Sequence, residues 1–178
     1  MGNITDSVLG YIFAKDRNRP HLLEAAFTDD VELRMIVQTD AISFPPVSKG
    51  REALADTLVR HFNQTYENIY TFCLANPLHG ETKSFSCPWL VAMSEKQSRT
   101  VRVGCGRYDW SFTDNGRVCG LVITVGAMEV LPAEALEPVM SWVSSLPYPW
   151  CPASTAADAI PALTGLRNIA LALRESGA

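Results

Sequence analysis

The stretch that decides the fold is Thr100–Val130, which reads TVRVGCGRYDWSFTDNGRVCGLVITVGAMEV. Two runs of alternating apolar residues, at about 100–113 and 117–130, flank the tripeptide DNG at 114–116. Because Asn and Gly tolerate a positive φ, this tripeptide predicts a tight turn between two antiparallel strands. The hairpin places the chain among proteins with an extended antiparallel sheet.

Further strands are predicted upstream of the hairpin. Runs rich in Tyr, Phe, Trp, Val and Cys at about 66–75 and 84–95 predict two more antiparallel strands. Pro88 lacks an amide hydrogen, which predicts an edge position or a bulge within its strand. Residues 31–37 alternate between apolar and polar side chains and predict a half-buried strand.

The N-terminal part of the chain predicts three helices. One face of a helix at about 3–15 carries Ile4, Val8, Tyr11, Ile12 and Lys15. Pro20 suits the first turn of a second, shorter helix. A third helix, at about 50–63, carries Leu54, Leu58, His61 and Phe62 on one face.

Two more helices are expected at the C-terminal end, at about 133–146 and 158–175, joined by the stiff segment PYPWCP at 147–152. Both are amphipathic, so we expect them to cover apolar surface of the sheet or of a partner subunit. The chain thus divides into a pocket domain at 1–131 and a helical extension at 132–178.

Composition excludes several classes of protein. The 178 residues are 47% hydrophobic and 19% charged, which is typical of a globular protein with a large core. The net charge of −4 and the scattered Lys and Arg argue against nucleic-acid binding. Neither a membrane-spanning run nor a secretory signal is present, so we expect a cytoplasmic protein without membrane contact.

The five cysteines are widely and irregularly spaced, which favours neither a disulfide framework nor a zinc site. We expect them to be small buried side chains. No other pattern of metal ligands is present, so we expect no metal ion.

Three segments carry a family resemblance: EAAFTDDV at 24–31, KGREAL at 49–54, and GRYDWSF at 106–112 followed by NGRV at 115–118. With the order of predicted elements, they make residues 3–131 resemble the nuclear-transport-factor-2-like superfamily. Its SnoaL-like members include polyketide cyclases, ketosteroid isomerases, scytalone dehydratases and limonene epoxide hydrolases. The resemblance implies an α+β fold in which a cone-shaped, curved antiparallel β-sheet is wrapped by N-terminal helices, the cystatin-like α+β barrel. It also implies cofactor-independent chemistry and a homodimer.

The resemblance suggests which residues face the pocket. In ketosteroid isomerases, a tyrosine on the first helix and a protonated aspartic acid on a late strand hold the substrate oxygen, and a second aspartate is the base. These positions correspond to Tyr11, Tyr108 and Met35. The acid of SnoaL-like cyclases corresponds to a position near Ile123. Two phenols are therefore present, but the carboxylates are not.

Candidate catalytic residues are Tyr11 and Tyr108, with His61 as the group that moves a proton because histidine titrates near neutral pH. For Tyr11 and His61 the competing interpretation is an ordinary packing role. Expected contacts to a substrate come from the following side chains: Met35, Trp110, Phe112, Leu121 and Ile123.

The roles of four charged residues depend on which face of its strand each one occupies. Glu32 and Arg34 on one strand, and Arg107 and Asp109 on another, are expected to face away from the pocket. A shift of one residue would exchange the two faces of each strand. These four side chains would then become the catalytic candidates.

Two functions remain open at this point. The chain is expected to bind a small, mostly apolar carbonyl compound, as a cofactor-independent isomerase, dehydratase or cyclase in which the two phenols stabilise an enolate-like oxygen. The alternative is a non-catalytic ligand-binding or assembly domain, which the missing acid pair favours. A homodimer is expected in either case.

Overall fold

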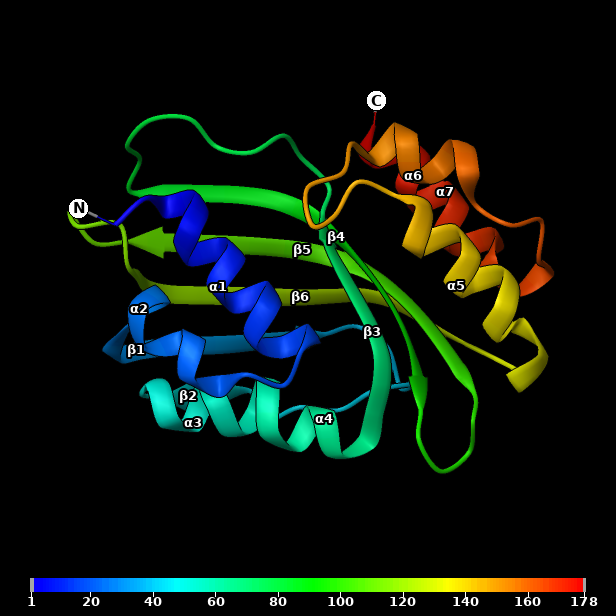
Figure 1. Ribbon diagram of the computed structural model, residues 1–178, viewed down its shortest axis with the longest axis horizontal. Coiled ribbons are helices and arrows are strands. Elements are labelled where there is room, and N and C mark those ends of the chain that lie inside the picture. Colours follow the sequence, from blue (N-terminus) through cyan, green and yellow to red (C-terminus); the bar gives the residue numbers. More distant parts are fainter. Residues whose placement is uncertain (1, 178) are drawn as a thin grey trace.

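The computed structural model describes residues 2–177, so Met1 and Ala178, the outer ends of the predicted domain and extension, lie outside the described residues. Six strands form one curved, unclosed sheet in the order β2-β1-β6-β5-β4-β3. The N-terminal helices lie on its concave face and the C-terminal helices at one end (Figure 1). The predicted α+β architecture is confirmed.

The element bounds are as follows. The strands are β1 Phe27–Val37, β2 Val47–Lys49, β3 Tyr66–Cys73, β4 Ser84–Glu95, β5 Val101–Phe112 and β6 Val118–Leu131. The α-helices are α1 Ile4–Asp16, α2 Leu23–Ala26, α3 Arg51–Ala55, α4 His61–Thr65, α5 Leu136–Ser145, α6 Ala153–Ala159 and α7 Arg167–Ser176. A π-helical segment, Asp56–Arg60, joins α3 to α4. Single 3₁₀ turns at Pro20–Leu22, Ala133–Ala135 and Thr164–Leu166 precede α2, α5 and α7.

The β5–β6 hairpin forms as predicted. Gly116 has the positive φ of +80° that the turn requires, whereas Asn115 does not. A bulge between Cys105 and Gly106 shifts the register of the two strands, and such bulges bend and twist a sheet. A side chain at Gly106 would place Cβ 1.8 Å from the carbonyl oxygen of Thr124, so only glycine fits where the strand bends.

The sheet is mixed rather than wholly antiparallel. β1 runs parallel to β6, with Met35 opposite Ile123, while all other neighbouring strands pair antiparallel. β1 also begins at Phe27, earlier than the predicted 31, because helix α2 ends directly before it. The short strand β2, which pairs with β1, was not predicted.

Pro88 of β4 lies opposite the end of β3, where its carbonyl oxygen accepts a hydrogen bond of 2.8 Å from the amide of Leu74. The last pair between β3 and β4 joins Cys73 to Trp89, so Pro88 is just beyond the paired part of β3. Its missing amide hydrogen therefore removes no bond to that strand. β4 is an interior strand, so the predicted edge position is wrong; Pro88 is accommodated at the end of the β3–β4 pairing instead.

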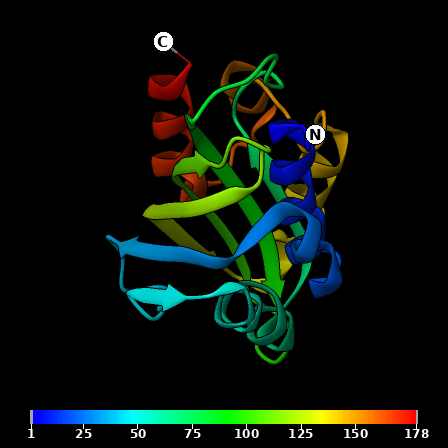
Figure 2. The ribbon, with the colours of Figure 1, turned by 90° about the vertical axis from the view of Figure 1, so that its left-hand side faces the viewer.

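The C-terminal helices pack on the outer face of the sheet, opposite α1. Their apolar side chains form a second cluster with Leu90 and Ala92 of β4 and Val103 of β5. Figure 1 shows α5, α6 and α7 grouped at the end of the molecule away from the N-terminus, and Figure 2 shows α7, in red, across the sheet from α1, in blue. Of the two expected locations, these helices therefore cover the sheet of their own chain.

The second C-terminal helix differs from its prediction. The expected helix at 158–175 is wrong, because α6 ends at Ala159 and α7 begins at Arg167. Pro161 lies between the two, and proline cannot continue a helical hydrogen-bond ladder. The segment 147–152 lies beside β3, where Cys73 bridges to Trp150.

The predicted strand faces are correct. Arg34 pairs with Glu32 at 2.6 Å, and Arg107 pairs with Asp109 at 2.9 Å, both on the exposed outer face of the sheet. The alternating apolar residues of β1, β5 and β6 therefore face α1. Among residues 2–177, the structure contains no helix with the length and apolar character that a bilayer crossing requires.

Candidate functional site

A small cavity lies inside the cone, between α1 and the concave face of the sheet. Its volume is about 30 Å³, which is room for about one or two water molecules. The interior of the cone is therefore largely packed. The cavity is lined by these side chains: Tyr11, Lys15, Met35, Ile42, Phe44, Leu58, Phe62, Trp89, Val91, Met93, Tyr108, Ile123, Val125 and Met128.

Two phenols meet on the wall of this cavity. The rings of Tyr11 and Tyr108 lie edge to face, with centroids 5.8 Å apart, and both side chains are buried. Trp110 supports Tyr11 from another side at 5.4 Å. Burial raises the pKa of both phenols above the usual value of tyrosine. They therefore stay protonated at neutral pH and can donate hydrogen bonds, but they cannot act as phenolate bases.

Lys15 also lines the cavity, although it was not among the site residues predicted from the sequence. It follows Tyr11 by one helical turn and is only 6% exposed. Its Nζ donates a hydrogen bond of 2.8 Å to Oγ1 of Thr71 and lies 4.5 Å from the centre of the Phe62 ring. Burial lowers the pKa of its amine. The signal was present in the sequence, because Lys15 ends the apolar face of the first helix.

The neighbouring carboxylate, Asp16, is held by three hydrogen bonds. The backbone amide and the hydroxyl of Thr71 each donate one at 2.7 Å, and the hydroxyl of Tyr148 donates a third at 2.7 Å. Lys15 Nζ lies 3.9 Å from Oδ1 of Asp16. Burial raises the pKa of Asp16, while the positive charge of Lys15 and these hydrogen bonds oppose that rise.

The structure brings together half of the residues singled out from the sequence. Tyr11, Tyr108, Met35 and Ile123 all line the inner cavity. Trp110, Phe112 and Leu121 face the same side of the sheet and are fully buried, but they do not line the cavity. They support its wall from behind, as the contact between Trp110 and Tyr11 shows.

His61 lies outside the cone. The sequence predicted that it shares an apolar face with Leu54 and Leu58, yet those two are buried and His61 is exposed. The π-helical segment at Asp56–Arg60 has wider turns than an α-helix, and Phe62 takes the inward position instead. This expectation about the position of His61 is therefore wrong.

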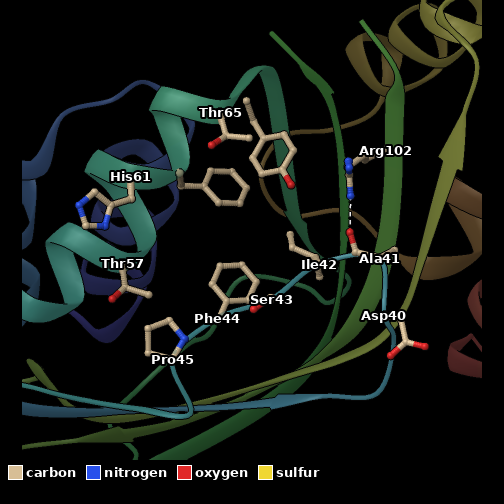
Figure 3. A pocket seen from close by; sticks show the side chains of 12 residues that line it. Asp40, Ala41, Ile42, Ser43, Phe44, Pro45, Thr57, His61, Thr65 and Arg102 are labelled. Carbon is tan, nitrogen blue, oxygen red and sulfur yellow. Dashed lines mark hydrogen bonds between the residues drawn. The ribbon is translucent and has the colours of Figure 1, made fainter. Parts of the chain in front are cut away.

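His61 lines a second, outer pocket of about 450 Å³. Figure 3 shows this pocket between the loop at 39–46, which carries Ile42 and Phe44, and the helix that carries His61 and Thr65. Arg102 donates a hydrogen bond to the backbone oxygen of Ala41 and so fixes the loop (Figure 3).

A thin wall separates the outer pocket from the inner cavity. Ile42, Phe44 and Phe62 line both spaces. The rings of Phe44 and Phe62 stack with centroids 6.4 Å apart and an interplanar angle of 12°. Since Phe44 belongs to a loop, its movement would join the two spaces into one.

No group of three or more His, Cys, Asp or Glu side chains within residues 2–177 is arranged to hold a metal ion. The polar groups that the cavity lining contributes are the phenols of Tyr11 and Tyr108, the amine of Lys15 and the indole of Trp89. The indole N–H of Trp89 has no hydrogen-bond partner within residues 2–177. A cavity with these donors suits a ligand that presents an acceptor oxygen.

Comparisons by sequence find no match, either to a protein-family model or to a curated protein. Comparison of the fold with solved structures finds several similar chains. A nuclear-transport-factor-2-like superfamily protein from Salmonella enterica serovar Typhimurium is 16% identical, with a TM-score of 0.54 over 70% of this chain and 89% of that chain.

Two further solved structures have names that state an activity or a ligand. A hexachlorocyclohexane dehydrochlorinase, LinA type 2, is 14% identical, with a TM-score of 0.56 over 72% of this chain and 86% of that chain. A computationally designed 17-OHP binder is 12% identical, with a TM-score of 0.51 over 66% of this chain and 88% of that chain. At these identities the likeness concerns the fold. The chain therefore has the fold of the nuclear-transport-factor-2-like superfamily, as its sequence resemblance predicted.

Proposed function

We propose that this chain binds a small, mostly apolar carbonyl compound, whose oxygen accepts hydrogen bonds from Tyr11 and Tyr108. The observation that carries this proposal is the pair of buried, edge-to-face phenols on the wall of an otherwise apolar cavity. Since burial keeps both phenols protonated, both can donate to one oxygen at neutral pH.

The ligand enters from the outer pocket. The inner cavity is too small for any organic molecule, but the outer pocket of about 450 Å³ falls within the usual range of ligand sites, about 300–1,000 Å³. Displacement of Phe44 lets the carbonyl end of a ligand reach Tyr11 and Tyr108, while its apolar body stays in the outer pocket.

Two donors at a carbonyl oxygen stabilise the negative charge that develops when the neighbouring carbon loses a proton. The reactions that pass through such an enolate are isomerisation, dehydration and cyclisation, and we propose one of these as the activity. His61 lines the outer pocket, so in this proposal it transfers a proton to or from the part of the ligand that lies there. Replacement of His61 by Gln, with turnover as the readout, tests that role.

A matched pair of ligands tests the binding proposal. Acetophenone and ethylbenzene have similar shapes, but only acetophenone has an oxygen, and quenching of tryptophan fluorescence reports their binding. We expect Tyr11→Phe and Tyr108→Phe each to weaken acetophenone binding by up to about tenfold, since a hydrogen bond contributes about 0.5–1.5 kcal/mol. Ethylbenzene binding should not change. Equal effects on both ligands, or none on acetophenone, would contradict the proposal.

The second candidate is a non-catalytic ligand-binding or assembly domain. Met35 and Ile123 favour it, because they occupy positions where related enzymes carry acids, and both line the cavity here. Thermal-shift screening separates the candidates: stabilisation by many apolar carbonyl compounds with no conversion of any supports the binding domain. Conversion that is lost in Tyr108→Phe supports the enzyme.

We also propose a homodimer that forms through the outer face of the sheet. Ile36 of β1 and Val47 of β2 are 48% and 44% exposed there, and exposed apolar side chains that gather on neighbouring strands can form a contact surface. Multi-angle light scattering measures the mass directly. A monomer at micromolar concentration would contradict the dimer, and Ile36→Glu should dissociate it.

A further inference from the structure

Lys15 has three features that the proposed role of the two phenols leaves unused. It is buried at the C-terminal end of α1, it lines the inner cavity, and it lies one helical turn from Tyr11. A lysine side chain is rarely buried to this extent without a direct partner of opposite charge.

Lys15 has few of the hydrogen-bond acceptors that a buried ammonium ion requires. An ammonium group has three N–H donors, and only one has an acceptor within hydrogen-bonding distance among residues 2–177, Oγ1 of Thr71 at 2.8 Å. The nearest carboxylate oxygen is Oδ1 of Asp16, at 3.9 Å, and it already accepts a hydrogen bond from the hydroxyl of Thr71. Burial lowers the pKa of the amine, which agrees with this geometry.

We infer that Lys15 is a nucleophile that forms a Schiff base with the carbonyl carbon of an aldehyde or ketone in the inner cavity. The inference rests on the proposed function, since it requires the same carbonyl ligand. It goes beyond that function because the bond is covalent. A desolvated lysine in an apolar site is a recognised nucleophile for carbonyl compounds.

The step balances without an oxidant or a reductant. The lone pair of Nζ attacks the carbonyl carbon, the C–N bond forms, and the carbonyl electron pair moves to oxygen, which gains the proton that nitrogen loses. The nitrogen lone pair then expels this oxygen, which takes up the second proton of the nitrogen and leaves as water. The products are one imine and one water from one amine and one carbonyl.

The surrounding groups suit this step. Tyr11 and Tyr108 donate to the carbonyl oxygen as it becomes negative. Oγ1 of Thr71 accepts from Lys15 and donates to Oδ1 of Asp16 at 2.7 Å, so these two residues hold Nζ in place. Thr71 and Asp16 are therefore positioning residues, and Lys15 alone forms the bond.

Reductive trapping tests the inference on the unmodified protein. The chain contains four lysines, and Lys49, Lys83 and Lys96 are exposed and serve as internal controls. The protein is incubated with hexanal and cyanoborohydride at about pH 7, digested, and analysed by mass spectrometry for the hexyl-amine product. We expect Lys15 to be modified at least about tenfold faster than the exposed lysines, because burial lowers the pKa of its amine.

Two parallel measurements separate the possible failures. If hexanal quenches tryptophan fluorescence in a manner that Tyr108→Phe weakens, but Lys15 is not trapped, the Schiff base is wrong and the proposed function stands. If hexanal neither binds nor modifies Lys15 while the exposed lysines react, the Schiff base and the proposed function are both wrong. Modification of all four lysines at equal rates also contradicts the inference.

Variants give an independent check. Lys15→Met should lose the fast modification while the slow modification of the other lysines is unchanged, with circular dichroism to verify folding. Phe44→Ala, which opens the wall between the two spaces, should accelerate trapping at Lys15 and leave the exposed lysines unaffected. A Phe44→Ala variant that accelerates all lysines alike would show general loosening of the protein instead, and would contradict the assigned route.

Discussion

The hydroxyl of Tyr148 donates a hydrogen bond of 2.7 Å to Oδ2 of Asp16, although 132 positions separate the two residues in sequence. Asp16 ends α1, and Tyr148 belongs to the segment that joins α5 to α6. The bond ties the C-terminal extension to the helix that carries Tyr11 and Lys15. The extension therefore contributes directly to the surroundings of the inner cavity.

Tyr148→Phe should destabilise the protein by about 1–3 kcal/mol, because it leaves a buried carboxylate with one hydrogen bond fewer. Urea denaturation measures this change. Tyr70→Phe is the matched control, since the ring of Tyr70 packs against Tyr148 but its hydroxyl has no hydrogen bond within residues 2–177. Equal losses in both variants would show that the bond to Asp16 contributes nothing specific.

Phe44→Ala should join the outer pocket to the inner cavity and speed the binding of acetophenone, measured by stopped-flow tryptophan fluorescence. Phe44 is only partly buried, so we expect a stability loss below the about 3–5 kcal/mol of a fully buried Phe→Ala change. Ser43→Ala, at the exposed neighbouring position, is the control. An unchanged association rate in Phe44→Ala would mean that ligands enter elsewhere.

Stability should fall as the pH rises above about 10, the pKa of tyrosine in an unfolded chain. Burial raises the pKa of Tyr11 and Tyr108 in the folded state, so the folded protein binds more protons than the unfolded chain in this range. Each such phenol contributes a slope of about −1.4 kcal/mol per pH unit. Urea denaturation between about pH 10 and 11 measures the free energy of unfolding, which should therefore fall less steeply with pH for Tyr108→Phe than for the wild type. Parallel slopes would contradict the raised pKa.

Gly106→Ala should prevent folding or destabilise the protein by more than about 3 kcal/mol. The new Cβ would lie 1.8 Å from the backbone oxygen of Thr124 and 2.8 Å from the Trp89 ring, which lines the cavity. Gly120→Ala is the control, because Cβ there meets Ser111 at an ordinary 3.6 Å. Its effect should stay within about 1 kcal/mol by urea denaturation. Similar losses at both glycines would contradict the close approach at Gly106.

The sequence by itself determined the strands other than β2, and the inner face of the sheet. Alternation along 101–112 and 118–131 is a local property of the chain, and the turn at Gly116 fixes how the two runs pair. Because side chains alternate between faces, it also followed that Tyr108 faces inward and that Arg107 and Asp109 face outward. The helical spacing of α1 likewise put Tyr11 on the cavity side.

Only the tertiary structure decided which inward side chains meet. The position of His61 depends on a π-helical segment that no local pattern indicated. The surroundings of Lys15 come from Asp16, Thr71 and Tyr148, which are distant in sequence. Local periodicity reports which face a residue occupies, whereas burial, the pKa of an amine and the size of a cavity depend on segments that the folded chain brings together.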